Sequence, residues 1–415
     1  MAGLSPLRIC LLSYRSNPHC GGQGVYIKNL SRSLKDLGHR VTVVSGPPDP
    51  LLDPDIPVIH MPSLDLYNPE DPFRIPGLKE LCDPISMAEW IGVSTTGFPE
   101  PFTFGLRAYG YVKRKRRLYD IVHDNQSLSY GVWGISKFMP TIPTIHHPIT
   151  VDREIDLKSR SSFLFKFKQL RWYSFLGMQK RVTRSFSRLI TVSESAKKDI
   201  AEDFRISQDR LSVVPNGINT ALFRPLAHVK RRKNRFIVTN SADTPLKGLK
   251  YLLAAMEKIN RKRPVSLVVV GQPKKDSGIT KLVRRLGLTD SVTFTGRIGD
   301  EEFVRQYAMA TAAVVPSVYE GFGLPVGEAM ACGVPVISTT GGALPEVVGN
   351  AGLLVPPADA DALAGAMQLI MDQPEYAEKL GKDGYRRVQE HFTWKKAAEK
   401  TVDVYREVIR DYGRF

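Results

Sequence analysis

The sequence of 415 residues contains four cysteines, and they are scattered along the chain. Cys10, Cys20, Cys82 and Cys332 lack the paired spacing of zinc or redox sites, and so few cysteines argue for a reducing compartment rather than a disulfide framework. No apolar run approaches the roughly 20 residues of a membrane span, and the apolar run near the start is too short for a signal sequence. We therefore expect a cytoplasmic protein.

Other signatures are missing as well. No Ser/His/Asp or Cys/His arrangement of a nucleophilic enzyme can be identified, and no RNA- or DNA-binding motif is present, so a specific nucleic-acid partner is not expected. The glycines at 21, 22 and 24 lie several residues beyond the first expected strand, 8–14, and do not form G-x-G-x-x-G. The second expected strand ends in Ser45 rather than in an acid. These details disfavour a dinucleotide-binding domain.

What is present is the composition of a globular protein, with 42% hydrophobic and 24% charged residues. A chain of this length is expected to form two or three domains. Strands and helices alternate on both sides of a polar, basic segment, which predicts an α/β protein with two doubly wound, Rossmann-like domains. We place the first domain at 1–218, the linker at 219–235, the second domain at 236–395 and a final helix at 396–415.

The net charge of +16 is concentrated in two places. Residues 113–117 are all basic, and nine basic residues and no acid occur from 158 to 188. We interpret 158–188 as one long helix with a cationic stripe (Lys168, Arg171, Arg181, Arg184 and Arg188) and a separate apolar stripe (Phe163, Phe167, Leu170, Tyr173 and Leu176). Such a helix suits peripheral contact with the inner face of an anionic membrane. The alternative is a solvated helix on the protein surface.

The most informative stretch runs from 313 to 346. An apolar strand is followed by Glu320 at its carboxyl end, a glycine loop, Pro325 in the first turn of a helix and a stop near Gly333. We place Glu328 in the first turn of this helix. Parallel sheets bind ligands at the carboxyl ends of their strands, and helix N-termini favour phosphate. Two acids would repel phosphate, so hydroxyl groups are their expected partners, and the combination suggests a sugar nucleotide.

The sequence EGFGLPVGEAMACGVPVIST resembles the E-x7-E signature of retaining glycosyltransferases of family GT4, which have the GT-B fold. The resemblance implies two domains facing each other across a cleft and a final helix that returns to the first domain. It also implies that Glu320 holds hydroxyls of the donor sugar and Glu328 the nucleotide ribose. Between them, Phe322, Gly323 and Leu324 are expected to line the donor site.

The resemblance extends to the phosphate contacts. In this family a glycine loop, here with Gly22 and Gly24, approaches the donor phosphates, and the lysine of a KG pair, here Lys247, clamps the pyrophosphate. The arginine that usually precedes this lysine by five residues is Ala242 in this sequence. We expect half of the clamp to be missing or supplied from elsewhere, with Arg297 as one candidate.

The implied activity is the transfer of a sugar from a nucleotide diphosphate donor to an acceptor hydroxyl, with retention and without a metal or other cofactor. The leaving phosphate would accept the proton of the incoming hydroxyl, and closure of the domains would exclude water. His146, at a strand end, matches the family histidine that faces the reacting sugar. The acceptor is expected to be a saccharide, a lipid or a lipid-linked saccharide, and the irregular segment 46–104 is either an acceptor-side insertion or a passive excursion.

Three other functions remain open. A glycoside hydrolase also uses paired carboxylates, but a phosphate-binding context would serve no purpose there. A sugar-nucleotide epimerase of the same architecture would release nucleotide and an altered sugar without an acceptor. A non-catalytic membrane or nucleic-acid binding protein on a decayed scaffold would explain the basic clusters and Ala242, although Glu320, Glu328 and Lys247 are intact.

Overall fold

The computed structural model describes residues 5–17, 21–68, 71, 74–159, 163–239, 244–274 and 277–413. The chain divides into two compact units. The first consists of Met1–Val192, Lys197–Val214 and Trp394–Phe415, and the second of Ser193–Ala196 and Pro215–Thr393. The segment 219–235, expected as a linker, is thus grouped with the second unit.

The first unit is built on a seven-stranded sheet in the order β3-β2-β1-β4-β5-β6-β7. All neighbouring strands pair in parallel. The strand residues are nearly all buried, as expected for a parallel sheet covered on both faces. The strands are β1 (Arg8–Ser13), β2 (Arg40–Ser45), β3 (Val58–His60), β4 (Ile121–Asn125), β5 (Thr141–Ile145), β6 (Leu189–Thr191) and β7 (Leu211–Val213).

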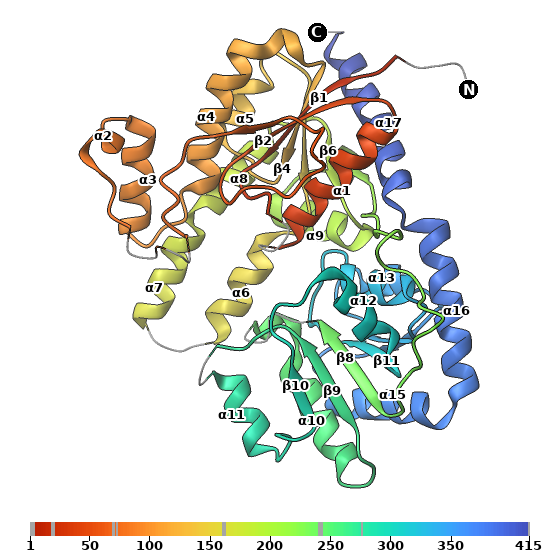
Figure 1. Ribbon diagram of the computed structural model, residues 1–415. Helices are drawn as coiled ribbons and strands as arrows, with labels where there is room; N and C mark the ends of the chain where they lie inside the picture. The colour runs from red at the N-terminus through yellow and green to blue at the C-terminus, as the bar shows by residue number, and fades with distance from the viewer. Residues whose placement is uncertain are drawn as a thin grey trace. The chain divides into compact units, whose positions relative to one another are not determined.

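The helices of the first unit include the last one in the chain. Its α17 packs beside α1, so that segments from opposite ends of the sequence lie side by side (Figure 1). Trp394 and Tyr405 of α17 share a core cluster with Tyr26 and Ile27 of α1. The helices are α1 (Gly22–Asp36), α2 (Leu78–Leu81), α3 (Pro84–Ser94), α4 (Glu100–Lys115), α5 (Tyr130–Ile135), α6 (Ile149–Ser159), α7 (Phe163–Trp172), α8 (Leu176–Thr183), most of α9 (Glu194–Phe204) and α17 (Trp394–Tyr412).

The second unit has a six-stranded parallel sheet in the order β10-β9-β8-β11-β12-β13. Its strands are β8 (Arg235–Thr239), β9 (Ser266–Val270), β10 (Val292–Phe294), β11 (Ala312–Val315), β12 (Val336–Thr339) and β13 (Leu353–Val355). Its helices are α10 (Leu249–Asn260), α11 (Gly278–Arg285), α12 (Asp300–Ala308), α13 (Leu324–Ala331), α14 (Leu344–Val348), α15 (Ala360–Asp372) and α16 (Pro374–His391). The strand order turns back beside β8 and β11, which is where doubly wound sheets bind ligands.

The expected single helix over 158–188 is wrong. Helices α6 and α7 are separate, and a 3-10 turn at Tyr173–Phe175 divides α7 from α8. Residues 160–162 lie outside the described residues. The physical reason for the break is that Tyr173, Phe175, Leu176 and Met178 are all buried, and these positions do not fall on one stripe of a continuous α-helix.

The expected cationic stripe is also not a free surface. Its four arginines make contacts within the first unit: Arg171 to Thr95, Arg181 to Tyr130, Arg184 to the carbonyl of Phe204, and Arg188 to Glu407. By contrast, the apolar side chains of Leu164, Phe167 and Leu170 on α7 are exposed by 71%, 61% and 54%. None of the helices described is long and apolar enough to cross a membrane.

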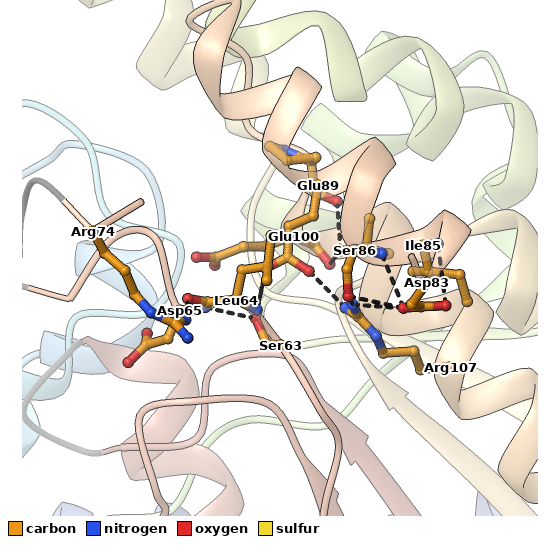
Figure 2. Close-up of polar contacts among 12 residues, drawn as sticks. Ser63, Leu64, Asp65, Arg74, Asp83, Ile85, Ser86, Glu89, Glu100 and Arg107 are labelled. Atoms are coloured by element: carbon orange, nitrogen blue, oxygen red, sulfur yellow. Dashed lines mark hydrogen bonds and ion pairs between the residues drawn. The ribbon is translucent and has the colours of Figure 1, made fainter. Parts of the chain in front are cut away.

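The segment 46–104 contains β3, α2 and α3, and a buried polar cluster fixes it to α4 (Figure 2). Glu89 of α3 accepts hydrogen bonds from the Ser63 hydroxyl at 2.6 Å and the backbone N–H of Leu64 at 3.1 Å. Arg107 of α4 pairs with Glu89 at 2.7 Å and donates to the Ser86 hydroxyl at 3.0 Å. The side chains of Glu89 and Arg107 are only 2% and 7% exposed, so the segment is an integral part of the first unit.

Candidate functional site

The second unit brings two of the expected donor residues together. Glu320 lies in the loop that follows the carboxyl end of β11, and Lys247 lies in the short 3-10 turn after β8. The Lys247 ammonium donates to Glu320 Oε1 at 2.7 Å, and the Ser317 hydroxyl donates to the same oxygen at 2.8 Å. The two side chains are 30% and 12% exposed. A lysine ammonium and a glutamate carboxylate therefore share one position at the strand ends.

Two glycines allow the loops around this ion pair to approach closely. Gly248 has φ +68°, and a Cβ added there would lie 1.9 Å from the carbonyl oxygen of Pro316. Gly342 has φ +62°, and its Cβ would lie 2.3 Å from the carbonyl oxygen of Glu320. Side chains at either position would push the lysine turn or the glutamate loop away, so the backbone requires glycine at both.

Glu328 lies one turn deeper than expected. Helix α13 begins at Leu324, so Glu328 is its fifth residue, in the second turn rather than the first. Burial raises the pKa of Glu328 to about 7, and a hydrogen bond with the Tyr307 hydroxyl partly offsets this effect. Tyr307 is itself 1% exposed. A carboxyl of this kind is held in a fixed, poorly hydrated position.

The residues between the two glutamates have structural roles as well. Phe322 is buried, and its ring meets that of Phe392 edge to face at 5.7 Å. Gly323 has φ +97° and precedes α13, whose N-terminus is capped by no side chain; Leu324 is the first helical residue. Backbone N–H groups at such an N-terminus attract anions.

Two other positions were considered for the phosphate clamp. Ala242 lies outside the described residues. Arg297 is exposed and follows β10, the edge strand, which β9 separates from β8 and its lysine turn. Lys247 and Glu320 are in direct contact, whereas Arg297 follows a strand two positions away in the sheet.

In the first unit, His146 is held at the carboxyl end of β5. Its backbone N–H donates to Gln126 Oε1 at 2.8 Å, and its ring Nε2 lies 2.7 Å from Asn125 Oδ1. The amide nitrogen of Asn125 faces the carbonyl of Gln23, which can only accept, so Oδ1 faces the histidine and Nε2 carries the proton. Burial lowers the pKa of His146 to about 3, so the ring is neutral at physiological pH.

Gly22 and Gly24, the two glycines expected to approach the donor phosphates, lie in a helix. Because α1 begins at Gly22 rather than near Val25, both Gly22 and Gly24 belong to its first turn. A Cβ added to Gly22 would meet no atom within 4 Å, so packing in this structure does not explain the glycine. Gly21 caps the helix with φ +134° and no side-chain hydrogen bond. An uncapped helix start without side chains is open to an anionic ligand.

His123 is a structural residue of the first unit. It is 1% exposed within β4, and its ring lies 2.5 Å from the Tyr405 hydroxyl and 2.6 Å from the Thr144 hydroxyl. Tyr405 belongs to α17, so this contact ties the end of the chain to the sheet. Asp124 accepts hydrogen bonds from Ser127 and from the backbone of Leu128, and burial raises its pKa to about 6.

Sequence reasoning missed the residues that position the site. Glu320 is held by Ser317, and Glu328 is held by Tyr307. His146 is held by Asn125 and Gln126. Asn125 and Gln126 lie at the carboxyl end of β4, where a parallel sheet places its ligand-binding residues, and this position was the available signal. Tyr307 lies in α12 and had none. In the part of the chain that the structure describes, no three His, Cys, Asp or Glu residues are grouped as metal ligands.

Comparison with known families identifies both halves of the chain. The family model for glycosyltransferase family 4 matches residues 20–222, and the model for glycosyl transferases group 1 matches residues 225–387. A solved structure of sucrose-phosphate synthase from Thermosynechococcus elongatus is 26% identical and covers 98% of this chain and 100% of its own, with a TM-score of 0.74. Anabaena HepE in complex with UDP and glucose shares the fold at 17% identity and a TM-score of 0.68, with 96% and 99% coverage.

Curated relatives agree with this result. The MMP alpha-(1->4)-mannosyltransferase of Mycolicibacterium hassiacum is 45% identical over 97% of this chain and 98% of that protein. A D-inositol 3-phosphate glycosyltransferase of Streptomyces bingchenggensis is 27% identical, with 99% and 92% coverage. The expectations of a glycosyltransferase and of the GT-B fold are confirmed, and the chain belongs to the group 1 glycosyltransferases of family 4.

Proposed function

We propose that this glycosyltransferase moves mannose from a nucleotide diphosphate mannose to a saccharide hydroxyl and forms an α-(1→4) bond with retention. The observation that carries the proposal is the Lys247–Glu320 pair at the strand ends, together with Glu328 in α13. The sugar and the bond are those named for the mannosyltransferase that is 45% identical over nearly the whole chain.

The roles of the residues follow from their chemistry. Lys247 supplies charge to the diphosphate, and Glu320 accepts hydrogen bonds from hydroxyls of the donor sugar. Glu328 accepts from the ribose hydroxyls. His146 is assigned to the reacting sugar on the strength of the family resemblance; as a neutral ring with a proton on Nε2 it acts by hydrogen bonding and not as a cation.

Retention and metal independence belong to the same proposal. An α-linked donor that yields an α-linked product is transferred with retention, and the leaving phosphate takes the proton of the acceptor hydroxyl on the same face. The bond between the anomeric carbon and the phosphate oxygen breaks as the bond to the acceptor oxygen forms. Lys247 and the free N–H groups at helix starts offset the charge on the leaving diphosphate, so we expect no need for a divalent cation.

The experiment is a donor and acceptor matrix. The protein is incubated with UDP-, GDP- and ADP-linked mannose and glucose, with and without a mannose oligosaccharide, and both released nucleotide and product linkage are measured. We expect mannosyl transfer that depends on the acceptor and is unchanged by EDTA. Nucleotide release together with an altered sugar and without acceptor would instead identify an epimerase, and a strict metal requirement would contradict metal independence. Glu320→Gln should abolish transfer, whereas Glu375→Gln, an exposed residue at the start of α16, is the matched control.

A lipid or lipid-linked acceptor is the second candidate, and the exposed face of α7 favours it. Lys166 and Lys168 lie among the exposed residues Leu164, Phe167 and Leu170 on this helix, an arrangement that suits an interfacial helix at an anionic membrane. Co-sedimentation with phosphatidylglycerol vesicles tests it, with Phe167→Ser/Leu170→Ser as the informative variant. Equal sedimentation with neutral and anionic vesicles, or no effect of this variant, would remove the membrane contact.

A further inference from the structure

The second unit contains a cavity of about 1010 Å³ at the amino-terminal edge of its sheet. Asn234 and Thr311, which line the cavity, immediately precede β8 and β11, and Gly333 shortly precedes β12. The turn with Lys247 and the loop with Glu320 follow the carboxyl ends of β8 and β11. Because the strands are parallel, the cavity lies at the edge of the sheet opposite to the donor residues.

One wall of the cavity is a face of α16. Pro374, Ala377, Gly381, Tyr385 and Gln389 line it at the three- and four-residue spacing of one helix face. A Cβ on Gly381 would lie 2.4 Å from the carbonyl oxygen of Gly333, so α16 contacts the chain after α13 directly and closes the cavity there. Pro225, Ile370 and Met371 add apolar surface.

The lining of the cavity is also strongly basic. Arg231, Arg232 and Lys233 belong to the segment that leads into β8, and Arg263, Lys382 and Arg386 also line the cavity, against two carboxylates, Glu378 and Glu390. Arg263 pairs with Asp372 at 2.7 Å and Lys382 with Glu378 at 2.7 Å. Arg232 and Lys233 form no ion pair with another residue that the structure describes. These two residues also line a neighbouring cavity of about 540 Å³, so they lie between two hollows.

We propose that this cavity is a second ligand site, for a phosphorylated small molecule with an apolar or aromatic portion. Small-molecule sites occupy roughly 300–1,000 Å³ and combine apolar walls with few charged groups, and this cavity lies at the upper end of that range. The basic segment offers phosphate contacts, and Met371 and Tyr385 offer a surface for a base or an alkyl group.

The test uses ATP and inorganic pyrophosphate as probes, measured by titration calorimetry on the full-length protein. We expect ATP to bind at least tenfold more tightly than pyrophosphate, because pyrophosphate lacks the aromatic portion. Arg232→Glu/Lys233→Glu should raise the Kd for ATP at least tenfold. The control Arg284→Glu/Arg285→Glu changes the same charge on exposed residues of α11 and should change the Kd less than twofold. Tyr385→Ala keeps the charge of the cavity, so it should weaken the binding of ATP and leave the Kd for pyrophosphate unchanged.

Photolabelling with 8-azido-ATP separates this site from the donor site. We expect label on peptides that contain 231–234 or 370–390. Label confined to peptides around 244–248 and 317–328 would overturn the proposal, as would equal losses in the two double variants or no binding at 1 mM. Stronger competition by polyglutamate than by ATP would overturn it in favour of an acidic peptide partner.

Discussion

Glu328 allows a test in which stability and binding change in opposite directions. Its pKa is raised by burial from 4.5 to about 7. Between these two values the folded protein keeps a proton that the unfolded chain has released, so stability falls as the pH rises through this window. At about 1.4 kcal/mol for each tenfold change in proton affinity, the ionised carboxylate reduces the free energy of unfolding by about 3 kcal/mol above pH 7.

The variant Glu328→Gln removes this charge and keeps the shape of the side chain. At pH 8.5 we expect it to be more stable than the unaltered protein by up to about 3 kcal/mol, and at pH 4.5 the two should be nearly equal. Binding of the nucleoside diphosphate should weaken by about 1–3 kcal/mol, because a charged hydrogen-bond acceptor for the ribose is lost.

The assay must report on the second unit. All four tryptophans, at positions 90, 133, 172 and 394, belong to the first unit, so tryptophan fluorescence would miss the change. Hydrogen exchange of peptides from β11 and α13, measured at pH 5 to 8.5 with correction for intrinsic exchange, reports the relevant opening free energy. A Glu328→Gln protein whose stability changes with pH in parallel with the unaltered protein, or that is less stable at pH 8.5, would refute the reasoning.

Three further predictions concern single contacts. Lys247→Ala should weaken binding of a nucleoside diphosphate at least tenfold and of the nucleoside less than twofold by calorimetry; equal losses would place the phosphate clamp elsewhere. Arg107→Ala should destabilise the first unit by about 3–5 kcal/mol in urea unfolding followed by tryptophan fluorescence, because Glu89 is left buried and unpaired; the exposed control Arg116→Ala should change stability by less than about 0.5 kcal/mol. His146→Ala should lower kcat without changing the shape of its pH profile from pH 5 to 8; a step near pH 6.5 that disappears in the variant would contradict a neutral imidazole.

Local patterns were sufficient for much of the fold. The first strand was expected at 8–14, and β1 runs from Arg8 to Ser13. The helix of the signature motif was expected to contain Pro325 in its first turn and to stop near Gly333, as it does. Caps, glycines and apolar periodicity are properties of neighbouring residues, so the sequence carries them directly.

The predictions that failed concern a helix break and a helix start, and one contact that was not predicted joins distant residues. The long helix over 158–188 was wrong because Tyr173 and Phe175 turn into the core, and no local signal separates a buried aromatic from an interfacial one. Glu328 was expected in the first turn, whereas α13 already begins at Leu324. The Lys247–Glu320 pair joins residues 73 positions apart. Lys247 and Glu320 were each identified by resemblance to the family, but their direct contact depends on the pairing of β8 with β11.

The position of α17 has a consequence for synthesis of the protein. The core of the first unit includes Trp394, Ala398, Val402 and Tyr405, and the Tyr405 hydroxyl is the partner of a buried ring nitrogen of His123. These residues follow every residue of the second unit in the sequence, so they are synthesised after it. The second unit is therefore complete before the first unit has received the last helix of its core. Loss of α17 would consequently affect the first unit, which contains the start of the chain, before the second.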